Sequence, residues 1–476
     1  MSPLNIFVRL FTCVIIIALL LGGTQTTTSM ASPMPKNIIV MIGDGMGYNQ
    51  SLAASYYGSG EAGLQVYNGF PVRFAESTYS ADGWGYDPDL AWNDTDSFQY
   101  QMQHSTDSAA AATAIATGVK TYDSAIGVDI EGDPIGNVLE AAEAIGKSTG
   151  VVSTVEFSHA TPAAFVAHNV SRDNYEAIAN EMIFESDTDV IMGTGNPWYD
   201  NSGLPLSIPN DYIFVGGQAT WDALVAGTVQ TDVDQDGELE TAVLIQELSQ
   251  FEALMSGETD YERVIGVPQV YTTLQEGRYG DAYANPYVVP FNANVPTLAE
   301  MSLAAINVLD NNPKGFVLMI EGGAIDLAAH LNLPGRFIEE QIDFDQAVQS
   351  VFDWVEANSS WAETLLIVTG DHETGYLWGS DSGPESDPKW QPLKSLGFNM
   401  LPDMQFYSTN HTNSLVAMYA KGDGASLFTS MVFGVDPVRG SYVDNTSIAR
   451  VIFGALDYDK IFLPVIELSG LSANLP

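Results

Sequence analysis

Four apolar runs of the sequence each end at a side chain that can bind a metal. One run begins at Asn37 and another at Thr364, and the other two begin at Gly150 and Phe316. Unbroken runs of this kind are typical of strands buried on both faces of a parallel sheet, whose carboxyl ends bind ligands. They therefore predict a metal site at one sheet edge. The residues in question are Asp44, His159 with Thr161, Glu321, and Asp371 with His372.

Three further residues add to this ligand set. Asp326 and His330 are four apart, so on a helix they share one face and could bind one ion. His411 lies in the polar context Thr-Asn-His-Thr. For any single histidine, a structural hydrogen-bonded role is the better interpretation. Four of the six histidines stand in these segments beside acids, which favours metal binding, and only His104 and His168 do not belong.

One hydroxyl is placed to act as a nucleophile. Ser108 follows Asp107 and begins an alanine-rich run that ends before Gly118. Alanine favours helix and glycine commonly follows a helix end, so Ser108 should lie in the first turn of a short helix. Backbone N–H groups and the helix dipole there favour an alkoxide or a bound phosphate. An ordinary core helix with a serine cap is the alternative.

An alternating α/β fold with a parallel sheet would position these residues. Helix-like stretches at 135–144, 297–309 and 339–358 lie between the apolar runs. The region of about 196–290, rich in Gly, Tyr, Asn and Asp, interrupts this alternation and is interpreted as an inserted accessory region. We expect one catalytic domain in 32–476 that contains this insertion.

Residues 1–31 have the pattern of a signal peptide. Arg9 precedes the apolar run 11–21, and Ser-Met-Ala ending at Ala31 resembles a cleavage site. An uncleaved anchor is the alternative. We expect a periplasmic or secreted protein with no membrane association after cleavage. The only cysteine, Cys13, lies in this segment, which excludes disulfides from the mature chain.

The chain is strongly acidic. Sixteen basic and sixty acidic residues give a formal charge of −44. Such a charge argues against nucleic acid and anionic lipid as partners, because their phosphates attract basic surfaces. An acidic surface on a folded core suits a salty medium, where ions screen the repulsion, so we interpret the charge as a halophilic adaptation.

A short acidic stretch could bind calcium. Asp232, Asp234 and Asp236 alternate, and Gly237 stands at the sixth position of a possible calcium loop. The glutamate expected at the twelfth position is missing, since Val243 is there. An acidic turn is the favoured interpretation.

Together these motifs resemble those of alkaline phosphatases. The resemblance runs from about residue 36 to the C-terminus outside the insertion. It implies a three-layer α/β/α sandwich with a large, mostly parallel sheet, a homodimer, and hydrolysis of phosphate monoesters of broad range. The residues that carry it are Asp44 in Gly-Asp-Gly-Met-Gly, Asp107-Ser108, Lys120-Thr-Tyr-Asp-Ser-Ala-Ile-Gly, His159-Ala-Thr161-Pro-Ala-Ala, Ser171-Arg172, Glu321, Asp326, His330, Asp371-His372 and His411-Thr.

The resemblance also implies roles residue by residue. Ser108 would form a phosphoserine, and Arg172 would clamp the phosphate with its planar fork. Two zinc ions and one magnesium ion would assist. The implied ligands are Asp326, His330 and His411 for the first zinc, Asp44, Asp371 and His372 for the second, and Asp44, Thr161 and Glu321 for magnesium.

Two residues depart from the common family pattern. His159 stands beside the third metal, where some members have aspartate and others histidine, so the preferred metal there is open. Leu327 stands where members often have a polar or aromatic residue beside the phosphate. Its loss of a polar partner is expected to weaken phosphate binding and speed product release.

Two other functions remain open. One is hydrolysis of diesters or sulfate esters by the same superfamily. Diesterases commonly use threonine and lack the arginine, and Ser108 lacks the C/S-x-P-x-R setting that sulfatases need. The other is a non-catalytic metal- or phosphate-binding protein, against which the complete ligand set argues.

Overall fold

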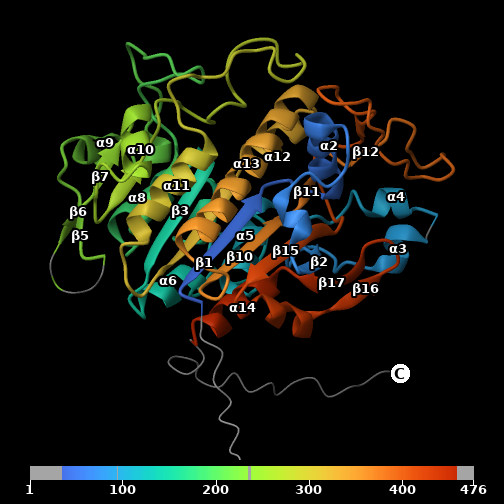
Figure 1. Cartoon of the computed structure of the whole chain (residues 1–476), viewed down its shortest axis with the longest axis horizontal. Coiled ribbons are helices and arrows are strands. Elements are labelled where there is room, and N and C mark those ends of the chain that lie inside the picture. The colour runs from blue at the N-terminus through green and yellow to red at the C-terminus, as the bar shows by residue number, and fades with distance from the viewer. Residues whose placement is uncertain (1–34, 94, 234–236, 238, 458–476) are drawn as a thin grey trace, which may run out of the picture. The chain divides into compact units, whose positions relative to one another are not determined.

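A large mixed sheet forms the centre of the protein (Figure 1). The computed structural model describes residues 35–457 except 94, 234–236 and 238. Seven neighbouring strands, from β10 to β7, run parallel, and the strands beyond β10 are mixed. In spatial order the eleven strands are β16 (Gly434–Asp436), β17 (Gly440–Asp444), β2 (Val72–Ser77), β15 (Val416–Gly422), β10 (Thr364–Gly370), β1 (Asn37–Gly43), β9 (Phe316–Gly322), β3 (Ser148–Glu156), β4 (Val190–Thr194), β8 (Val264–Gly266) and β7 (Val243–Ile245).

The central strand β1 is buried along its whole length, as its apolar run predicts. Ile38, Val40 and Ile42 pack into the core on one face of the sheet. Ile39 and Met41 pack into the core on the other face. Successive side chains of a strand point to opposite faces, so an unbroken apolar run needs cover on both.

Helices supply that cover in two layers, which confirms the three-layer α/β/α sandwich (Figure 1). On the face of Ile38 they are α5 (Ser108–Thr117), α6 (Val138–Glu143), α7 (Ala160–Ala164), α8 (Tyr175–Phe184), α9 (Gln218–Val225) and α14 (Thr446–Ala455). On the face of Ile39 they are α2 (Tyr48–Ser59), α10 (Leu248–Met255), α11 (Leu298–Leu309), α12 (Ala324–His330) and α13 (Pro334–Asn358).

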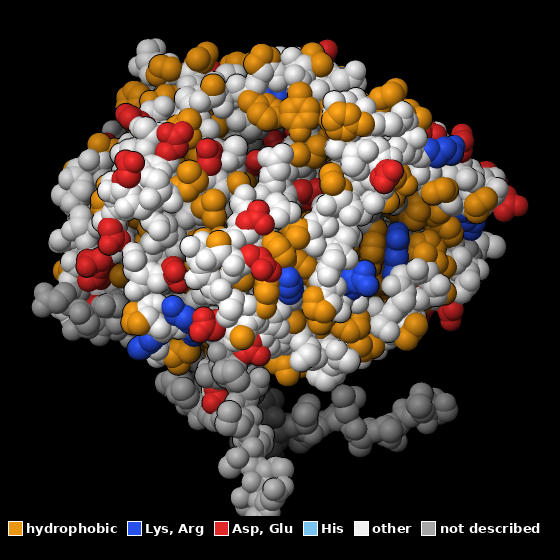
Figure 2. Space-filling model, viewed as in Figure 1, with side chains coloured by type: hydrophobic (Ala, Val, Ile, Leu, Met, Phe, Trp, Pro, Cys, Tyr) orange, Lys and Arg blue, Asp and Glu red, His pale blue; other side chains and the backbone are white. Residues whose placement is uncertain are grey.

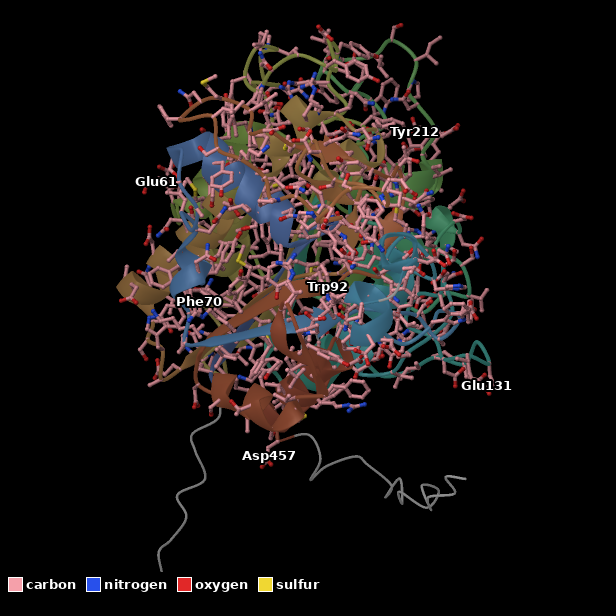
Figure 3. The ribbon with its side chains drawn as sticks, turned by 90° about the vertical axis from the view of Figure 1, so that its right-hand side faces the viewer. Glu61, Phe70, Trp92, Glu131, Tyr212 and Asp457 are labelled. Carbon is pink, nitrogen blue, oxygen red and sulfur yellow. The ribbon has the colours of Figure 1, made fainter. Side chains whose placement is uncertain are left out.

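Shorter elements lie in the connections, and Figure 3 shows one side of the described part, with Trp92 near its middle. They are α3 (Pro88–Trp92), α4 (Ser97–Tyr100), η1 (Val66–Gly69), η2 (Ile213–Val215), η3 (Ala425–Met431) and the strand pairs β5 (Gln230–Thr231) with β6 (Glu240–Thr241), β11 (Glu373–Thr374) with β14 (His411–Thr412), and β12 (Leu377–Trp378) with β13 (Gln405–Phe406).

The three predicted helices are present, with shifted starts. The stretch predicted at 135–144 begins as α6 only at Val138, because Asn137 caps the helix through its side chain. Thr297 caps α11 in the same way. The stretch predicted to begin at 339 starts five residues earlier, at Pro334, since proline is well suited to the first turn of a helix.

The segment 196–290 contributes two strands, β7 and β8, to one edge of the central sheet, together with α9 and α10. Its separation as an accessory region stays a prediction. The predicted signal peptide and, in the possible calcium loop, Asp234 and Asp236 lie outside the described residues. No helix in 35–457, apart from the five undescribed positions there, has the length and apolar character needed to span a membrane.

Three glycines form a row where the central strands end. Gly43 of β1 lies opposite Gly370 of β10 and Gly322 of β9. A Cβ on Gly370 would come within 2.3 Å of the Met46 carbonyl oxygen, and one on Gly322 within 2.9 Å of the Phe344 ring. Glycine at these positions therefore lets neighbouring segments pack closely against the ends of the strands, directly beside the predicted metal ligands.

Replacing Gly118 tests how α5 ends. Its φ of 75° is left-handed, and Ala449 would be 3.4 Å from an added Cβ, so alanine fits the space but not the backbone. We expect Gly118→Ala to lower the free energy of unfolding by about 1 kcal/mol, measured by urea denaturation. Gly69→Ala, at an open position without a left-handed φ, is the control and should change it little. Equal effects would contradict this account.

Candidate active site

The parallel strands bring the acids to one edge, as the sequence predicts. Asp44 directly follows β1, and Asp371 directly follows its neighbour β10. Glu321 lies in β9, opposite Ile42 of β1. All three carboxylates are fully buried. The carboxyl ends of three adjacent strands thus place them side by side.

Ser108 lies where the sequence predicts, in the first turn of α5. The side chain of Asp107 caps this helix by accepting a hydrogen bond of 3.0 Å from the Ala110 N–H. The hydroxyl of Ser108 is 3.2 Å from Nε2 of His372, the residue after Asp371. The predicted nucleophile and the predicted ligands therefore meet at one place.

The ligand atoms form three overlapping groups. In each group the atoms all lie within 4.8 Å of one another. Asp44 and His372 each belong to two groups, so the three positions are neighbours. The groups are Asp44 with Asp371 and His372, Asp326 with His372 and His411, and Asp44 with His159 and Glu321.

The first group has more acceptors than the protein can satisfy. Nε2 of His372 faces Asp371 Oδ2 at 3.1 Å and Asp44 Oδ1 at 3.5 Å as well as Ser108. One ring N–H can donate to only one of these oxygens. Both oxygens of Asp44 and Oδ2 of Asp371 are buried without a hydrogen-bond partner among the described residues. A bound cation would satisfy these oxygens.

The electrostatics agree with the geometry. Burial raises the pKa of Asp44 well above its usual value, and the charges of Asp371, Asp326 and Glu321 raise it further. Burial has the largest effect on His372 and lowers its pKa, and the charge of the neighbouring His411 lowers it further. The site therefore favours a neutral His372 imidazole, the form that binds metals, and it resists holding several carboxylates ionised without a counter-charge.

Backbone carbonyls orient the second pair of histidines. Nδ1 of His330 lies 2.5 Å from the Thr409 carbonyl, and Nδ1 of His411 lies 2.8 Å from the Thr106 carbonyl. These contacts place a ring proton on Nδ1 of each histidine and turn both Nε2 atoms toward the site. The two Nε2 atoms are 2.9 Å apart, and that of His330 is 3.3 Å from Asp326. His330 thus joins Asp326 and His411 at a position suited to a cation.

The third group contains more oxygen. Burial raises the pKa of Glu321 to about 7, although the hydroxyls of Ser153 and Thr161 act to lower it. Ser153 donates a short hydrogen bond to this carboxylate. Nδ1 of His159 is buried without a hydrogen-bond partner among the described residues. Thr161 and His159 come from the start of α7, which follows β3. Carboxylate and hydroxyl oxygens suit magnesium.

Arg172 reaches the site from the loop before α8. Its Nη1 is 3.0 Å from Oδ2 of Asp107, and its Nη2 is 3.1 Å from Nε2 of His159. Burial lowers its pKa, but the Asp107 carboxylate more than offsets this and holds the pKa above the usual value. The guanidinium is thereby fixed beside Ser108, with N–H donors left for an anion.

A cavity of about 510 Å³ opens over these residues. Its wall contains Ser108, Arg172, His159 and Asp326, and Leu327 adds an apolar side chain. Ser108, Arg172 and the predicted zinc and magnesium ligands therefore line this cavity or belong to the ligand groups beside it. The two histidines set aside lie elsewhere: His104 stacks on Trp84, and His168 contacts Glu181.

The sequence did not reveal several supporting contacts. Thr374 donates a hydrogen bond of 2.5 Å to Asp326 and lies 3.2 Å from Nδ1 of His372, which ties two groups together. Asp107 both caps α5 and holds Arg172. The position of Asp107 directly before Ser108 was a signal for the cap. The carbonyls of Thr106 and Thr409 carried no such signal, because their residue types do not matter.

Sequence comparison places the chain among the phosphatases. A family model described as alkaline phosphatase matches residues 35–430. Alkaline phosphatase 4 of Bacillus subtilis (strain 168) is 31% identical over 373 residues, covering 77% of this chain and 67% of that protein. Alkaline phosphatase of Escherichia coli (strain K12) is 31% identical over 376 residues, covering 74% of each.

Solved structures agree. A cold-active alkaline phosphatase from the psychrophile Shewanella sp. superposes with a TM-score of 0.62 at 26% identity, covering 88% of this chain and 99% of that one. Alkaline phosphatase from the Antarctic bacterium TAB5 superposes with a TM-score of 0.60 at 24% identity, covering 89% and 99%. The chain belongs to the alkaline phosphatase family. It is a phosphomonoesterase, a metal-binding hydrolase of phosphate monoesters.

Removing the metal should destabilise the protein. Without a cation, the buried carboxylates around Asp44 repel one another, so EDTA should lower the thermal unfolding midpoint and added zinc should restore it. A metal at a thousandfold excess over its dissociation constant contributes about 4 kcal/mol. Scanning calorimetry at fixed pH and salt, beside metal analysis, measures the change.

The matched control is Asp371→Asn, which removes one of the repelling charges. EDTA should shift its midpoint less than that of the unmodified protein. An unchanged midpoint in unmodified protein from which EDTA has removed all metal would contradict this prediction.

Proposed function

We propose that this chain hydrolyses phosphate monoesters of broad range through a phosphoserine at Ser108, with two zinc ions and one magnesium ion. The observation that carries the proposal is the position of the Ser108 hydroxyl. It lies 3.2 Å from His372, a member of two ligand groups, at the N-terminus of α5.

The donor sets fit the proposed metals. Asp326 with His330 and His411, and Asp44 with Asp371 and His372, offer the imidazole and carboxylate ligands that zinc takes readily. Asp44, Thr161 and Glu321 offer oxygens, as magnesium prefers. Metals bound there would stabilise the entering and leaving oxygens of an in-line displacement and lower the pKa of a coordinated hydroxyl. His159 adds an imidazole to the third group, a ligand that zinc also takes.

Ser108 and Arg172 supply the nucleophile and the phosphate-binding group of the proposed reaction. Oγ of Ser108 forms a bond to phosphorus as the bond to the ester oxygen breaks, and the alcohol leaves. Water then cleaves the phosphoserine, which returns the hydroxyl and releases inorganic phosphate. Arg172 binds two phosphate oxygens through its planar fork, which favours monoesters over diesters. The free N–H groups at the start of α5 favour the negative charge.

Replacing the nucleophile tests the covalent route. We expect Ser108→Ala to lower kcat for p-nitrophenyl phosphate at least about a thousandfold, because the oxygen that forms the intermediate is gone. Acid-quenched protein should also lose the phosphate label at this residue. Ser105→Ala removes another hydroxyl of the same cavity and should keep kcat within about threefold. Retained turnover in Ser108→Ala would exclude the phosphoserine.

Leu327 is proposed to set how tightly the product binds. It lines the cavity beside Asp326 and offers no hydrogen bond to phosphate. Leu327→Lys adds a cation there, so we expect the inhibition constant for inorganic phosphate to fall about tenfold and kcat to fall where product release limits it.

Leu331→Lys is the matched control. Leu331 follows the same helix, is 59% exposed and lies outside the cavity wall. It should leave phosphate inhibition unchanged. The proposal for Leu327 is wrong if both lysine variants bind phosphate no more tightly than the unmodified protein.

We also propose export, a homodimer and a salty habitat. Export to the periplasm or the medium is supported by the signal-like composition of residues 1–31, and the habitat by the charge of −44. The homodimer follows from the family resemblance, and the segment 196–290 is proposed as an accessory region that could serve that contact.

A further inference from the structure

A second cationic cleft lies outside the metal site. Tyr48, Arg73, Phe74, Tyr419 and Arg439 are among the residues that line it, and its volume is about 440 Å³. None of these five residues lines the cavity over Ser108. In Figure 2, blue Lys and Arg side chains lie among orange ones in a hollow on the right-hand half of the face shown.

The sheet brings the two arginines to the same end of neighbouring strands. Arg73 lies in β2, opposite Tyr419 of β15. Arg439 directly precedes β17, which runs parallel to β2 with Tyr442 opposite Ala75. Both guanidinium charges act on Tyr419, where they oppose the rise in its pKa that burial causes.

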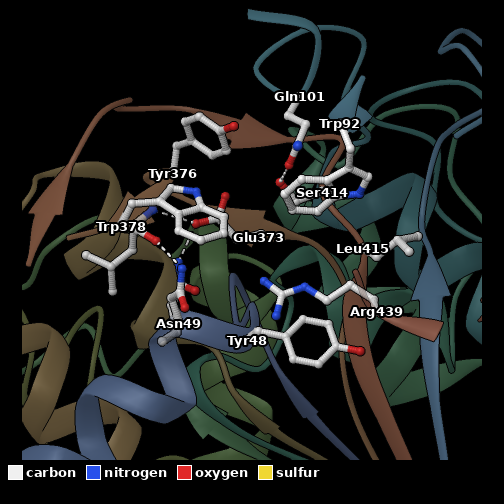
Figure 4. Close-up of a pocket in the computed structure, with 12 residues that line it drawn as sticks. Tyr48, Asn49, Trp92, Gln101, Glu373, Tyr376, Trp378, Ser414, Leu415 and Arg439 are labelled. Atoms are coloured by element: carbon white, nitrogen blue, oxygen red, sulfur yellow. Dashed lines mark hydrogen bonds between the residues drawn. The ribbon is translucent and has the colours of Figure 1, made fainter. Parts of the chain in front are cut away.

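Arg439 is held by rings instead of by acceptors. Its guanidinium carbon lies 4.0 Å from the centre of the Tyr48 ring and 5.9 Å from that of Trp378 (Figure 4). Its side chain has no hydrogen bond or ion pair to any residue that the structure describes. Stacking on a ring leaves the edge of the guanidinium, with its N–H groups, free to donate.

Other half-buried or buried arginines of this chain differ. Arg263 donates to the carbonyls of Thr188 and Ile183, and Arg278 forms an ion pair of 2.7 Å with Glu339. A buried guanidinium without acceptors costs free energy, so purely structural arginines find them. The unused donors of Arg439 point to a ligand.

The nearby acids are occupied by other donors. Asp436 accepts hydrogen bonds from Tyr86, from Trp92 and from the backbone N–H groups of Val438 and Arg439. Glu373 accepts from Gln50, Thr412 and the Leu377 N–H. Arg73 donates only to the Asn68 carbonyl among the described residues. Among the described residues, neither of these two guanidiniums forms an ion pair with a carboxylate.

We propose that this cleft is a second anion site, which binds a phosphate-type oxyanion between Arg73 and Arg439. The planar forks match such oxygens, and the rings of Tyr48 and Tyr419 offer walls to a flat organic group. The site does not depend on Ser108 or on the metal ligands, so it stands apart from the proposed hydrolysis.

Calorimetric titration of the metal-loaded protein at low ionic strength tests this proposal. With inorganic phosphate we expect two sites per chain in the unmodified protein. Arg439→Met should leave one, because each charged hydrogen bond lost costs about tenfold or more in affinity. Arg172→Met should also leave one, by weakening the other site. Phenylphosphonate binding more tightly than phosphate at the Arg439 site would show that the aromatic walls hold a ring.

Three controls keep the result unambiguous. Arg450→Met removes an exposed arginine that does not line the cleft and should keep two sites. Arg73→Met changes an exposed side chain, so it serves if Arg439→Met fails to fold. The Arg439→Met variant should hydrolyse phosphate esters at Ser108 at the unmodified rate. In the unmodified protein, phosphate should change the fluorescence of Trp378, which the Trp378→Phe variant identifies. In Arg439→Met this change should be lost. One site in the unmodified protein, or two sites in both cleft variants, would overturn the proposal.

Discussion

The structure depends on holding several carboxylates together where water cannot reach them. Asp44, Asp371 and Glu321 are fully buried at the ends of three adjacent strands. Burial raises the pKa of Asp44, and the charges of Asp371 and Glu321 raise it further. A protein interior tolerates such a cluster when cations balance it. His330 and His411, oriented by backbone carbonyls, complete positions at which cations can bind.

The fold was predictable because its signals are local. The apolar run at β1 is buried on both faces, and the parallel order of the strands follows from helices that alternate with them. The alanine-rich run from Ser108 to Gly118 forms α5 with the expected start and end. Ligands at strand ends were predictable for the same reason, since parallel strands place their carboxyl ends together.

The contacts between distant segments were not predictable from local signals. Asp107 holds Arg172 across 65 positions, and Thr374 donates to Asp326 across 48. The carbonyls that orient His330 and His411 come from any residue type, so the sequence does not mark them. Arg73 and Arg439 line one cleft because of the strand order at the mixed edge of the sheet, where β17 lies parallel to β2.

The row of Gly43, Gly370 and Gly322 fixes the spacing of the residues that follow the three central strands. Neighbouring strands lie about 4.8 Å apart. Because glycine lets each strand turn at the edge of the sheet without pushing its neighbours apart, Asp44 and Asp371 follow their strands at close to the backbone spacing. The close approach of the Asp44 and Asp371 carboxylates, which belong to one ligand group, is then inherited from the hydrogen-bond geometry of the polypeptide itself.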